Sequence, residues 1–258
     1  MKAIILCAGE GTRLRPHTNA VPKCLVEVRG QTMLDRALGV LRASGIDDVV
    51  AVVGWCGERV VRPGLKTVTN PRFASTNMVA SLFCAREHLQ GDVLIVYGDI
   101  VFTRPAVEGL LTVDAQAAVG VNTRWRELWE MRMADPLADA ETLKIGADGN
   151  LVALGQKPRS YADIEGQYMG LISLRAKATE AFLSFYDGLE PTRLYDGVER
   201  DRMFMTTFLQ LVIDRLMPLR AVPIPGQWLE VDSIEDIACY ARSSAYVDEV
   251  FREPQKTR

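Results

Sequence analysis

The sequence of 258 residues has little of what several common enzyme classes require. Its two histidines, His17 and His88, and the lack of a Gly-x-Ser-x-Gly motif argue against acyl transfer through an activated serine or cysteine. The five cysteines are odd in number and form no Cys-x-x-Cys pair, which argues against a zinc site or a disulfide framework. We therefore expect buried free thiols and a cytoplasmic protein.

Long apolar runs are missing as well. No stretch approaches the ~18 apolar residues that a membrane span requires, and the apolar run after Lys2 is too short for a signal peptide. The formal net charge of −3 argues against a dedicated nucleic-acid surface. We expect neither a membrane nor a nucleic acid as partner, and a single domain over residues 1–258. The sequence leaves open whether the chain forms a homodimer.

The first 25 residues are the most informative part of what is present. Residues 2–7 are almost wholly apolar, which predicts a strand buried on both faces. The loop that follows contains Gly9 and Gly11, where the backbone can approach a ligand closely, and the cations Arg13 and Lys23. Backbone N–H groups and basic side chains after a buried strand predict a phosphate-binding loop.

This loop does not match the two best-known phosphate-binding motifs. A P-loop requires Lys followed by Ser or Thr after its last glycine, and this loop has no such pair. The dinucleotide-binding motif requires a third glycine where Leu14 stands. An ordinary turn with basic residues by chance is a third alternative, and the combination of two glycines, two prolines, Arg13 and Lys23 argues against it.

The rest of the chain alternates between apolar runs and amphipathic stretches. This alternation predicts an α/β fold with a Rossmann-like, doubly wound, mostly parallel mixed sheet flanked by helices. Residues 122–167 have weaker periodicity and predict extended or hairpin structure, and we expect a small β lid over the acceptor within residues 122–175. We predict strands at 48–53, 92–97, 115–121, 167–174, 219–224 and 228–231, helices at 32–44, 76–89, 176–186, 203–216 and 233–250, and loop at 70–75 and 189–201.

Acidic residues follow two of the predicted strands. Asp99 comes after the run 92–97, and Glu230 and Asp232 stand two residues apart, on one face if their strand continues that far. Carboxylates beside a phosphate loop suit Mg²⁺, which binds hard oxygen ligands together with substrate phosphates. Alternatively, Asp99 caps a turn, and Asp232 stabilises the N-terminus of the helix that follows it.

The N-terminal pattern resembles the signature of nucleotidyltransferases that transfer NMP to a phosphorylated small molecule. That signature is Leu-x-Ala-Gly-x-Gly-x-Arg-Leu-x-Pro-x-Thr, followed by Pro-Lys-x-Leu. The resemblance implies that Arg13 and Lys23 bind the reacting phosphates and that Asp99, Asp232 and Glu230 hold Mg²⁺. The matching residues are Leu6, Ala8, Gly9, Gly11, Arg13, Leu14, Pro16, Thr18, Pro22, Lys23 and Leu25.

The segments 70–81, 205–210 and 228–232 resemble the cytidylyltransferases that act on phosphocholine and on small phosphonates such as 2-aminoethylphosphonate. This resemblance implies that CTP is the nucleotide, that CMP is transferred to a phosphate or phosphonate acceptor, and that pyrophosphate is released. The nucleotide-binding residues that it implies are Leu6, Ala8, Gly9, Glu10, Gly11, Thr12, Asn70, Thr76, Asn77, Ser81 and Gly98.

The acceptor site is less defined, with Lys157, Tyr168 and Trp228 as candidates. A quaternary ammonium group would need an aromatic cage and a carboxylate, whereas a phosphonate acid would need cations, and the sequence does not choose between them. Candidates for the cage are Trp125, Trp129, Tyr168, Tyr195 and Trp228 with Asp196 and Glu130; those for the cations are Arg124, Arg126 and Arg132.

Three other functions compete with this interpretation. A sugar-1-phosphate nucleotidyltransferase would use dTTP, UTP or GTP on the same fold. A catalytically inactive nucleotide-binding sensor would not need Arg13, Lys23, Asp99 and Asp232 to be intact. A metal-dependent glycosyltransferase would require an Asp-x-Asp motif after a central strand, and the sequence has none there.

Overall fold

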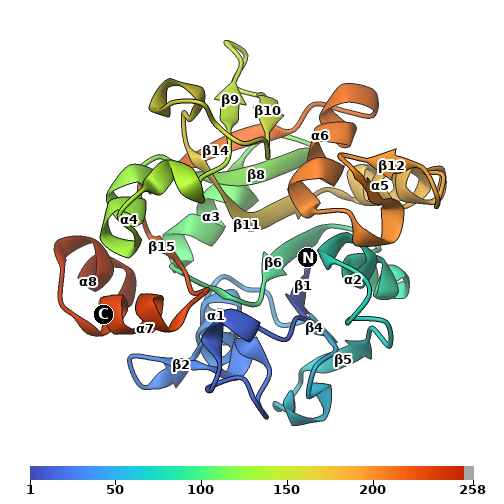
Figure 1. Ribbon diagram of the computed structural model, residues 1–258. Coiled ribbons are helices and arrows are strands. Elements are labelled where there is room, and N and C mark those ends of the chain that lie inside the picture. Colours follow the sequence, from blue (N-terminus) through green and yellow to red (C-terminus); the bar gives the residue numbers. More distant parts are fainter. Residues whose placement is uncertain (253–258) are drawn as a thin grey trace.

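The structure, a computed structural model, describes residues 1–252. A central sheet of seven strands runs through the molecule, with helices packed against it (Figure 1). In spatial order its strands are β14 (Arg220–Ile224), β8 (Ala117–Asn122), β11 (Gln167–Leu174), β6 (Val93–Tyr97), β1 (Lys2–Cys7), β4 (Val49–Val53) and β5 (Lys66–Thr69).

Eight α-helices are present in residues 1–252, and α4 contacts α7 among them. Helix α1 contacts α3, while α2 contacts α6, and Phe83, Phe182 and Phe208 join α2, α5 and α6 through edge-to-face aromatic contacts. The helices are α1 (Met33–Ala43), α2 (Met78–Cys84), α3 (Arg104–Thr112), α4 (Trp125–Arg132), α5 (Ala176–Asp187), α6 (Met205–Arg215), α7 (Ile234–Ala241) and α8 (Ala245–Phe251). None of them is long and apolar enough to cross a membrane.

The order of the strands confirms the predicted doubly wound topology. Strand β1 pairs in parallel with β4 on one side and β6 on the other, so the chain reverses its direction of winding at β1. Strand β11 runs antiparallel between β6 and β8, which makes the sheet mixed. In open α/β sheets, ligands bind outside the carboxyl ends of the strands at such a switch point.

Four two-stranded sheets complete the fold. The hairpin of β9 and β10 stands at the top of Figure 1, and β10 contacts α6. Strand β15 pairs with β7 rather than with the central sheet. These pairs are β9 (Leu143–Ile145) with β10 (Leu151–Leu154), β12 (Leu194–Tyr195) with β13 (Val198–Glu199), β15 (Trp228–Glu230) with β7 (Ile100–Phe102), and β2 (Glu27–Val28) with β3 (Gln31–Thr32).

Several predicted elements had wrong bounds. The helix predicted at 76–89 is shorter, because the Asn77 side chain caps it by accepting from Met78 N, and the chain tightens into a 3-10 turn at Arg86–His88. The helix predicted at 233–250 is two helices, because Ser244 accepts from Val247 N and starts α8 afresh. Helices α3 and α4 and the short strands β12 and β13 were not predicted. The hairpin within 122–167 is confirmed.

Candidate active site

The carboxyl ends of β1 and β6 lie side by side, because Leu6 is paired with Tyr97. A Cβ atom at Gly98 would lie 2.6 Å from the Leu6 carbonyl oxygen and 2.7 Å from the Cys7 Sγ atom. Only glycine therefore allows the two chain segments to approach this closely. Asp99, the next residue in the chain, therefore lies beside the loop that follows β1.

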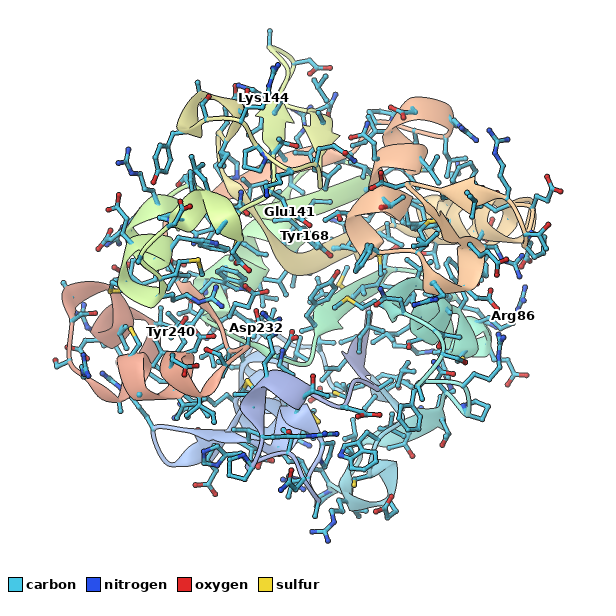
Figure 2. All side chains as sticks on the ribbon, in the orientation of Figure 1. Arg86, Glu141, Lys144, Tyr168, Asp232 and Tyr240 are labelled. Carbon is cyan, nitrogen blue, oxygen red and sulfur yellow. The ribbon has the colours of Figure 1, made fainter. Side chains whose placement is uncertain are left out.

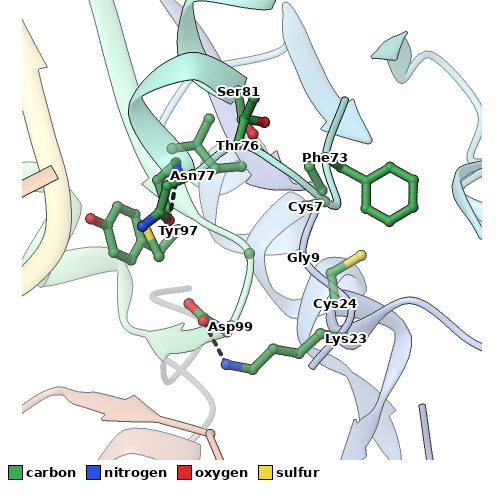
Figure 3. A pocket seen from close by; sticks show the side chains of 14 residues that line it. Cys7, Gly9, Lys23, Cys24, Phe73, Thr76, Asn77, Ser81, Tyr97 and Asp99 are labelled. Carbon is green, nitrogen blue, oxygen red and sulfur yellow. Dashed lines mark hydrogen bonds and ion pairs between the residues drawn. The ribbon is translucent and has the colours of Figure 1, made fainter. Parts of the chain in front are cut away.

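Two basic and two acidic side chains from distant parts of the sequence meet at this edge of the sheet. The Lys23 Nζ atom donates to Asp99 Oδ2 and to Asp232 Oδ1, each at 2.6 Å. The Arg13 Nη2 atom lies 3.0 Å from the same Asp232 oxygen. Figure 3 shows Lys23 reaching across to Asp99. Four of the five residues that the sequence singles out for phosphate and metal binding thus form one cluster.

The loop conformation explains why Lys23 reaches this point. Gly11 has a positive φ of 62°, and a Cβ atom there would lie 3.0 Å from Cβ and Cγ of Lys23, so the lysine stem fits closely against the glycine. The Thr18 hydroxyl donates to the Gly11 carbonyl oxygen at 2.8 Å and holds the loop in place. Pro22 is extended and leads into the 3-10 turn that begins at Lys23.

The charges in this cluster stabilise one another. Burial disfavours the Lys23 ammonium, but Asp99 and Asp232 outweigh it and raise the pKa of Lys23. Burial likewise opposes ionisation of Asp232, but Lys23, Arg13 and Arg132 together lower the pKa of Asp232 to about 2. At neutral pH the cluster therefore contains a charged lysine and an ionised Asp232 carboxylate.

Glu230 is bonded to Arg132 and not to Lys23. Arg132, whose side chain is 2% exposed, donates from Nη1 to Glu230 at 2.9 Å, from Nε to Asp236 at 2.8 Å and from Nη2 to Asp232 at 3.4 Å. Burial and the Asp232 charge raise the pKa of Glu230 to about 8, although the Arg132 charge opposes this shift. Arg132 thus holds Glu230, Asp232 and Asp236 from the interior of the protein, a role that the sequence did not reveal.

A first cavity opens between the loop after β1 and the start of α2. The Asn70 amide does not line it but donates to Thr76 Oγ1 at 2.9 Å and to Ser81 Oγ at 3.0 Å, and so orients two lining hydroxyls. Figure 3 views this cavity from close by. Its lining residues are Leu6, Cys7, Ala8, Gly9, Lys23, Cys24, Phe73, Thr76, Asn77, Met78, Ser81, Tyr97, Gly98 and Asp99.

The remaining loop residues predicted to bind nucleotide do not line this cavity. The Glu10 carboxylate accepts from Arg15 at 3.0 Å, Gly11 forms the left-handed turn, and Thr12 is exposed at the start of a 3-10 turn. Neither the Glu10 nor the Thr12 side chain faces the first cavity, so the backbone is the part of this segment that is left to contact a nucleotide there.

A second cavity lies on the other side of the acidic residues. Tyr168 and Trp228 both line it, as predicted for acceptor residues, and Arg13 and Asp232 form the part that adjoins Lys23. Lys157 is exposed after β10 and lines neither cavity. The lining residues are Arg13, Met78, Tyr97, Trp129, Asp139, Glu141, Gln167, Tyr168, Met169, Gly170, Phe204, Met205, Thr206, Trp228, Glu230 and Asp232.

The structure does not assemble the predicted aromatic cage. Trp129 stacks on Trp228 with ring centroids 6.1 Å apart and an interplanar angle of 15°, and Trp125 stacks on Tyr161. Tyr195 is buried, and its hydroxyl donates to a backbone carbonyl oxygen. The tryptophan rings therefore pack against other aromatic rings and do not form an open cage.

The predicted cation set for a phosphonate is not assembled either. Arg124 is paired with Glu127 and Glu249, and Arg126 with Glu130, so both lie on the outer side of α4. Arg132 is enclosed by its three acidic partners. Arg13 is the basic residue that lines the second cavity in the part of the chain that the structure describes.

Asp99 and Asp232 have the donor chemistry that suits a divalent cation. One carboxylate oxygen of each residue accepts a hydrogen bond from the Lys23 ammonium. The second oxygen of Asp99, Oδ1, is buried and has no hydrogen-bond partner in residues 1–252. Hard cations such as Mg²⁺ prefer oxygen ligands of this kind. No group of three or more His, Cys, Asp or Glu side chains in the described range is arranged around a metal position.

Comparison with known proteins agrees with this geometry. The chain belongs to the MobA-like NTP transferase domain family, whose model matches residues 3–157. A CTP:phosphoglutamine cytidylyltransferase of Campylobacter jejuni is 35% identical over 249 residues, 92% of this chain and 98% of that protein. A choline-phosphate cytidylyltransferase of Streptococcus pneumoniae is 36% identical over 106 residues, 40% of this chain and 46% of that protein.

The fold itself is shared with solved structures. The inositol-1-phosphate CTP transferase from T. maritima superposes with a TM-score of 0.74 at 21% identity, over 96% of this chain and 94% of that one. The predicted resemblance and the predicted fold class are both confirmed.

Proposed function

We propose that this protein transfers CMP from CTP to a small phosphorylated or phosphonate acceptor and releases pyrophosphate. The observation that carries this conclusion is the cluster of Arg13, Lys23, Asp99 and Asp232 between two cavities. A reaction between two anions requires cations at the point where they meet, and this cluster lies where both cavities adjoin. The similarity to a cytidylyltransferase over nearly the full length of both chains supports CTP as the nucleotide.

In the proposed reaction, an acceptor oxygen attacks the α-phosphorus of CTP. One P–O bond forms to the acceptor, the bond between the α-phosphorus and the bridging oxygen breaks, and that oxygen leaves with pyrophosphate. The nucleophile is already an anion, so no general base is needed. Catalysis then consists of positioning and of neutralising charge.

The described side chains have distinct roles in this scheme. Thr76, Asn77 and Ser81 face the first cavity, where the base binds, and the loop backbone at Ala8 and Gly9 faces the phosphates. Lys23 neutralises the α-phosphate, and Arg13 neutralises the leaving pyrophosphate or the acceptor.

Mg²⁺ is part of this proposal. Asp99 and Asp232 would hold the ion, because their oxygens share one point and Asp99 Oδ1 has no partner in residues 1–252. When bound, the ion supplies positive charge that withdraws electrons from the triphosphate. Lys23 would have to leave its position between the two carboxylates, and a phosphate oxygen is the partner that its ammonium would take instead.

We also propose that residues 122–175 cover the acceptor. Asp139 and Glu141, which precede β9, and Gln167 and Tyr168 at the start of β11 line the second cavity. The hairpin of β9 and β10 lies farther out, beside α6 (Figure 1).

Pyrophosphate release with a matrix of nucleotides and acceptors tests the proposal. CTP, UTP, dTTP and GTP are each combined with phosphocholine, 2-aminoethylphosphonate and a sugar 1-phosphate. We expect turnover with CTP and a non-sugar acceptor, its loss with EDTA and its return with added Mg²⁺. Turnover with the sugar phosphate alone would establish the sugar nucleotidyltransferase instead, and nucleotide binding without any turnover would establish a sensor.

A further inference from the structure

We propose that the acceptor carries a primary ammonium group and that Glu141 is the specificity-determining residue that binds it. This inference rests on the proposed function, because it concerns the acceptor side of the same site. Glu141 lies in the segment between α4 and β9, where no sequence pattern marks a functional residue. In Figure 2 it lies near Tyr168, and Asp232 is labelled below both of them.

The backbone of Glu141 is held firmly in place. Its N–H group donates to Gln167 Oε1 at 3.1 Å, and Gln167 Nε2 donates back to the Glu141 carbonyl oxygen at 2.5 Å. Gln167 is the first residue of β11 and is 4% exposed, so the central sheet anchors this contact. The Glu141 side chain is thereby presented to the second cavity from a fixed position.

The Glu141 carboxylate lacks a positive partner. Within residues 1–252 it has no ion pair or side-chain hydrogen bond, and its charged neighbours, Asp139 and Asp196, are acidic. Burial, followed by repulsion from these two carboxylates, raises the pKa of Glu141 to about 7. A partly buried carboxylate without a partner is unfavourable, and a cationic group on a ligand would remove this penalty.

Two other residues of this cavity also have a polar atom without a partner. The Trp228 side chain is 1% exposed, and its Nε1–H group has no acceptor in the described residues, nor has the buried Tyr168 hydroxyl a partner. Both residues line the cavity that contains Glu141. Unpaired polar atoms in the wall favour a polar rather than an apolar ligand in this cavity.

The aromatic residues argue for a primary rather than a quaternary ammonium. A quaternary ammonium has no N–H donor and is recognised by open aromatic faces. In this cavity Trp129 is 4% exposed and stacked on Trp228, and Tyr97 is 9% exposed. Phe204 is an exposed ring, at 56%, and Tyr168 is partly exposed but packs edge-to-face against Tyr97. Two such rings do not enclose a cation as a cage does. A primary ammonium can instead donate N–H groups to Glu141.

The opposite part of the same cavity suits the anionic group of such an acceptor. Arg13 lines it next to Asp232 and close to Lys23, where the phosphate or phosphonate must react. An acceptor with an anion at one end and a primary ammonium at the other therefore matches both ends of the cavity.

The test compares acceptors that differ only at the amine. With CTP, 2-aminoethylphosphonate is measured against ethylphosphonate, and phosphoethanolamine against phosphocholine, in the wild type, in Glu141→Gln and in Glu130→Gln. Glu130 is exposed on α4 and paired with Arg126, so it is a matched control outside the cavity. We expect Glu141→Gln to raise KM at least about tenfold for the primary amines, and to leave KM for CTP and for ethylphosphonate within about twofold. Glu130→Gln should behave as the wild type.

Two results would overturn the inference while leaving the proposed function intact. One is a wild type that uses phosphocholine or ethylphosphonate as efficiently as the primary amines. The other is a Glu141→Gln variant whose KM rises equally for acceptors with and without the amine. Lack of pyrophosphate release with every acceptor, sugar phosphates included, would instead contradict the proposed function itself.

Discussion

The two cavities on either side of Lys23 are built in different ways. The first is lined by residues 6–9, 23–24, 73–78, 81 and 97–99, all within the first hundred residues and close to the ends of β1 and β6. The second takes most of its lining from residues 129–170 and 204–232. It contains four acidic residues, whereas Asp99 is the acidic residue of the first. The first cavity is therefore built where the sheet changes its direction of winding, and the second by segments from later in the chain.

Lys23→Met removes the cation that bonds to both Asp99 and Asp232, and we expect the largest effect from it. Turnover should fall by about 10³-fold, because the substitution removes charge stabilisation at the reacting phosphates. The rate of pyrophosphate release at saturating CTP and acceptor measures the effect. Lys66→Met is the matched control, since Lys66 is exposed on β5 and paired with Asp48. A loss of less than about tenfold in Lys23→Met would contradict the assigned role.

Arg132→Met should destabilise the fold beside the second cavity. Glu230, Asp232 and Asp236 would lose a partner that is 2% exposed, and the free energy of unfolding should fall by about 3–5 kcal/mol. Urea unfolding followed by circular dichroism measures it. Arg126→Met on the outer side of the same helix should change stability by less than about 1 kcal/mol. Equal losses in both variants would show that burial of Arg132 does not matter.

Acceptor binding should depend on pH in a way that nucleotide binding does not. Glu141 has a raised pKa of about 7, so its carboxylate is largely protonated at pH 6 and largely ionised at pH 8. Because an ammonium group binds the ionised form, KM for 2-aminoethylphosphonate should fall about tenfold between these pH values. The Glu141→Gln variant with the same acceptor keeps the phosphonate titration and lacks that of Glu141, so the ratio of the wild-type and variant KM values isolates Glu141. A ratio that does not change with pH would contradict this assignment.

Glu10→Gln should have the smallest effect. The Glu10 carboxylate bonds to Arg15 on the surface and does not line the first cavity, so KM for CTP should change less than about twofold. Steady-state kinetics at varied CTP measure this. A larger change would show that the loop binds the nucleotide through this side chain and not only through its backbone.

The geometry around Lys23 could be predicted because most of its determinants are local in sequence. The apolar run before Ala8 fixes β1, and Gly9, Gly11 and Lys23 follow within a short stretch of chain. The positions of Asp99 and Asp232 also followed from the ends of strands. The acceptor side could not be predicted in this way.

Arg132 bonds to Asp236, 104 positions away in the chain, and Glu141 bonds to Gln167, 26 positions away. No periodic pattern in the sequence records such distant contacts. Helix α4 was missed for the same reason. Its residues alternate between buried tryptophans and charged pairs within a segment that otherwise has no periodicity.

The reversed direction of β11 has a consequence for how this protein can change over time. Because Gln167 is paired with Asn122, the chain departs from the sheet and rejoins it at neighbouring points of the same edge. Everything between them is a detour whose length the sheet does not constrain. Evolution could therefore lengthen or shorten the part of the detour that follows Arg132, and so change the lining of the second cavity, while Lys23 keeps its position.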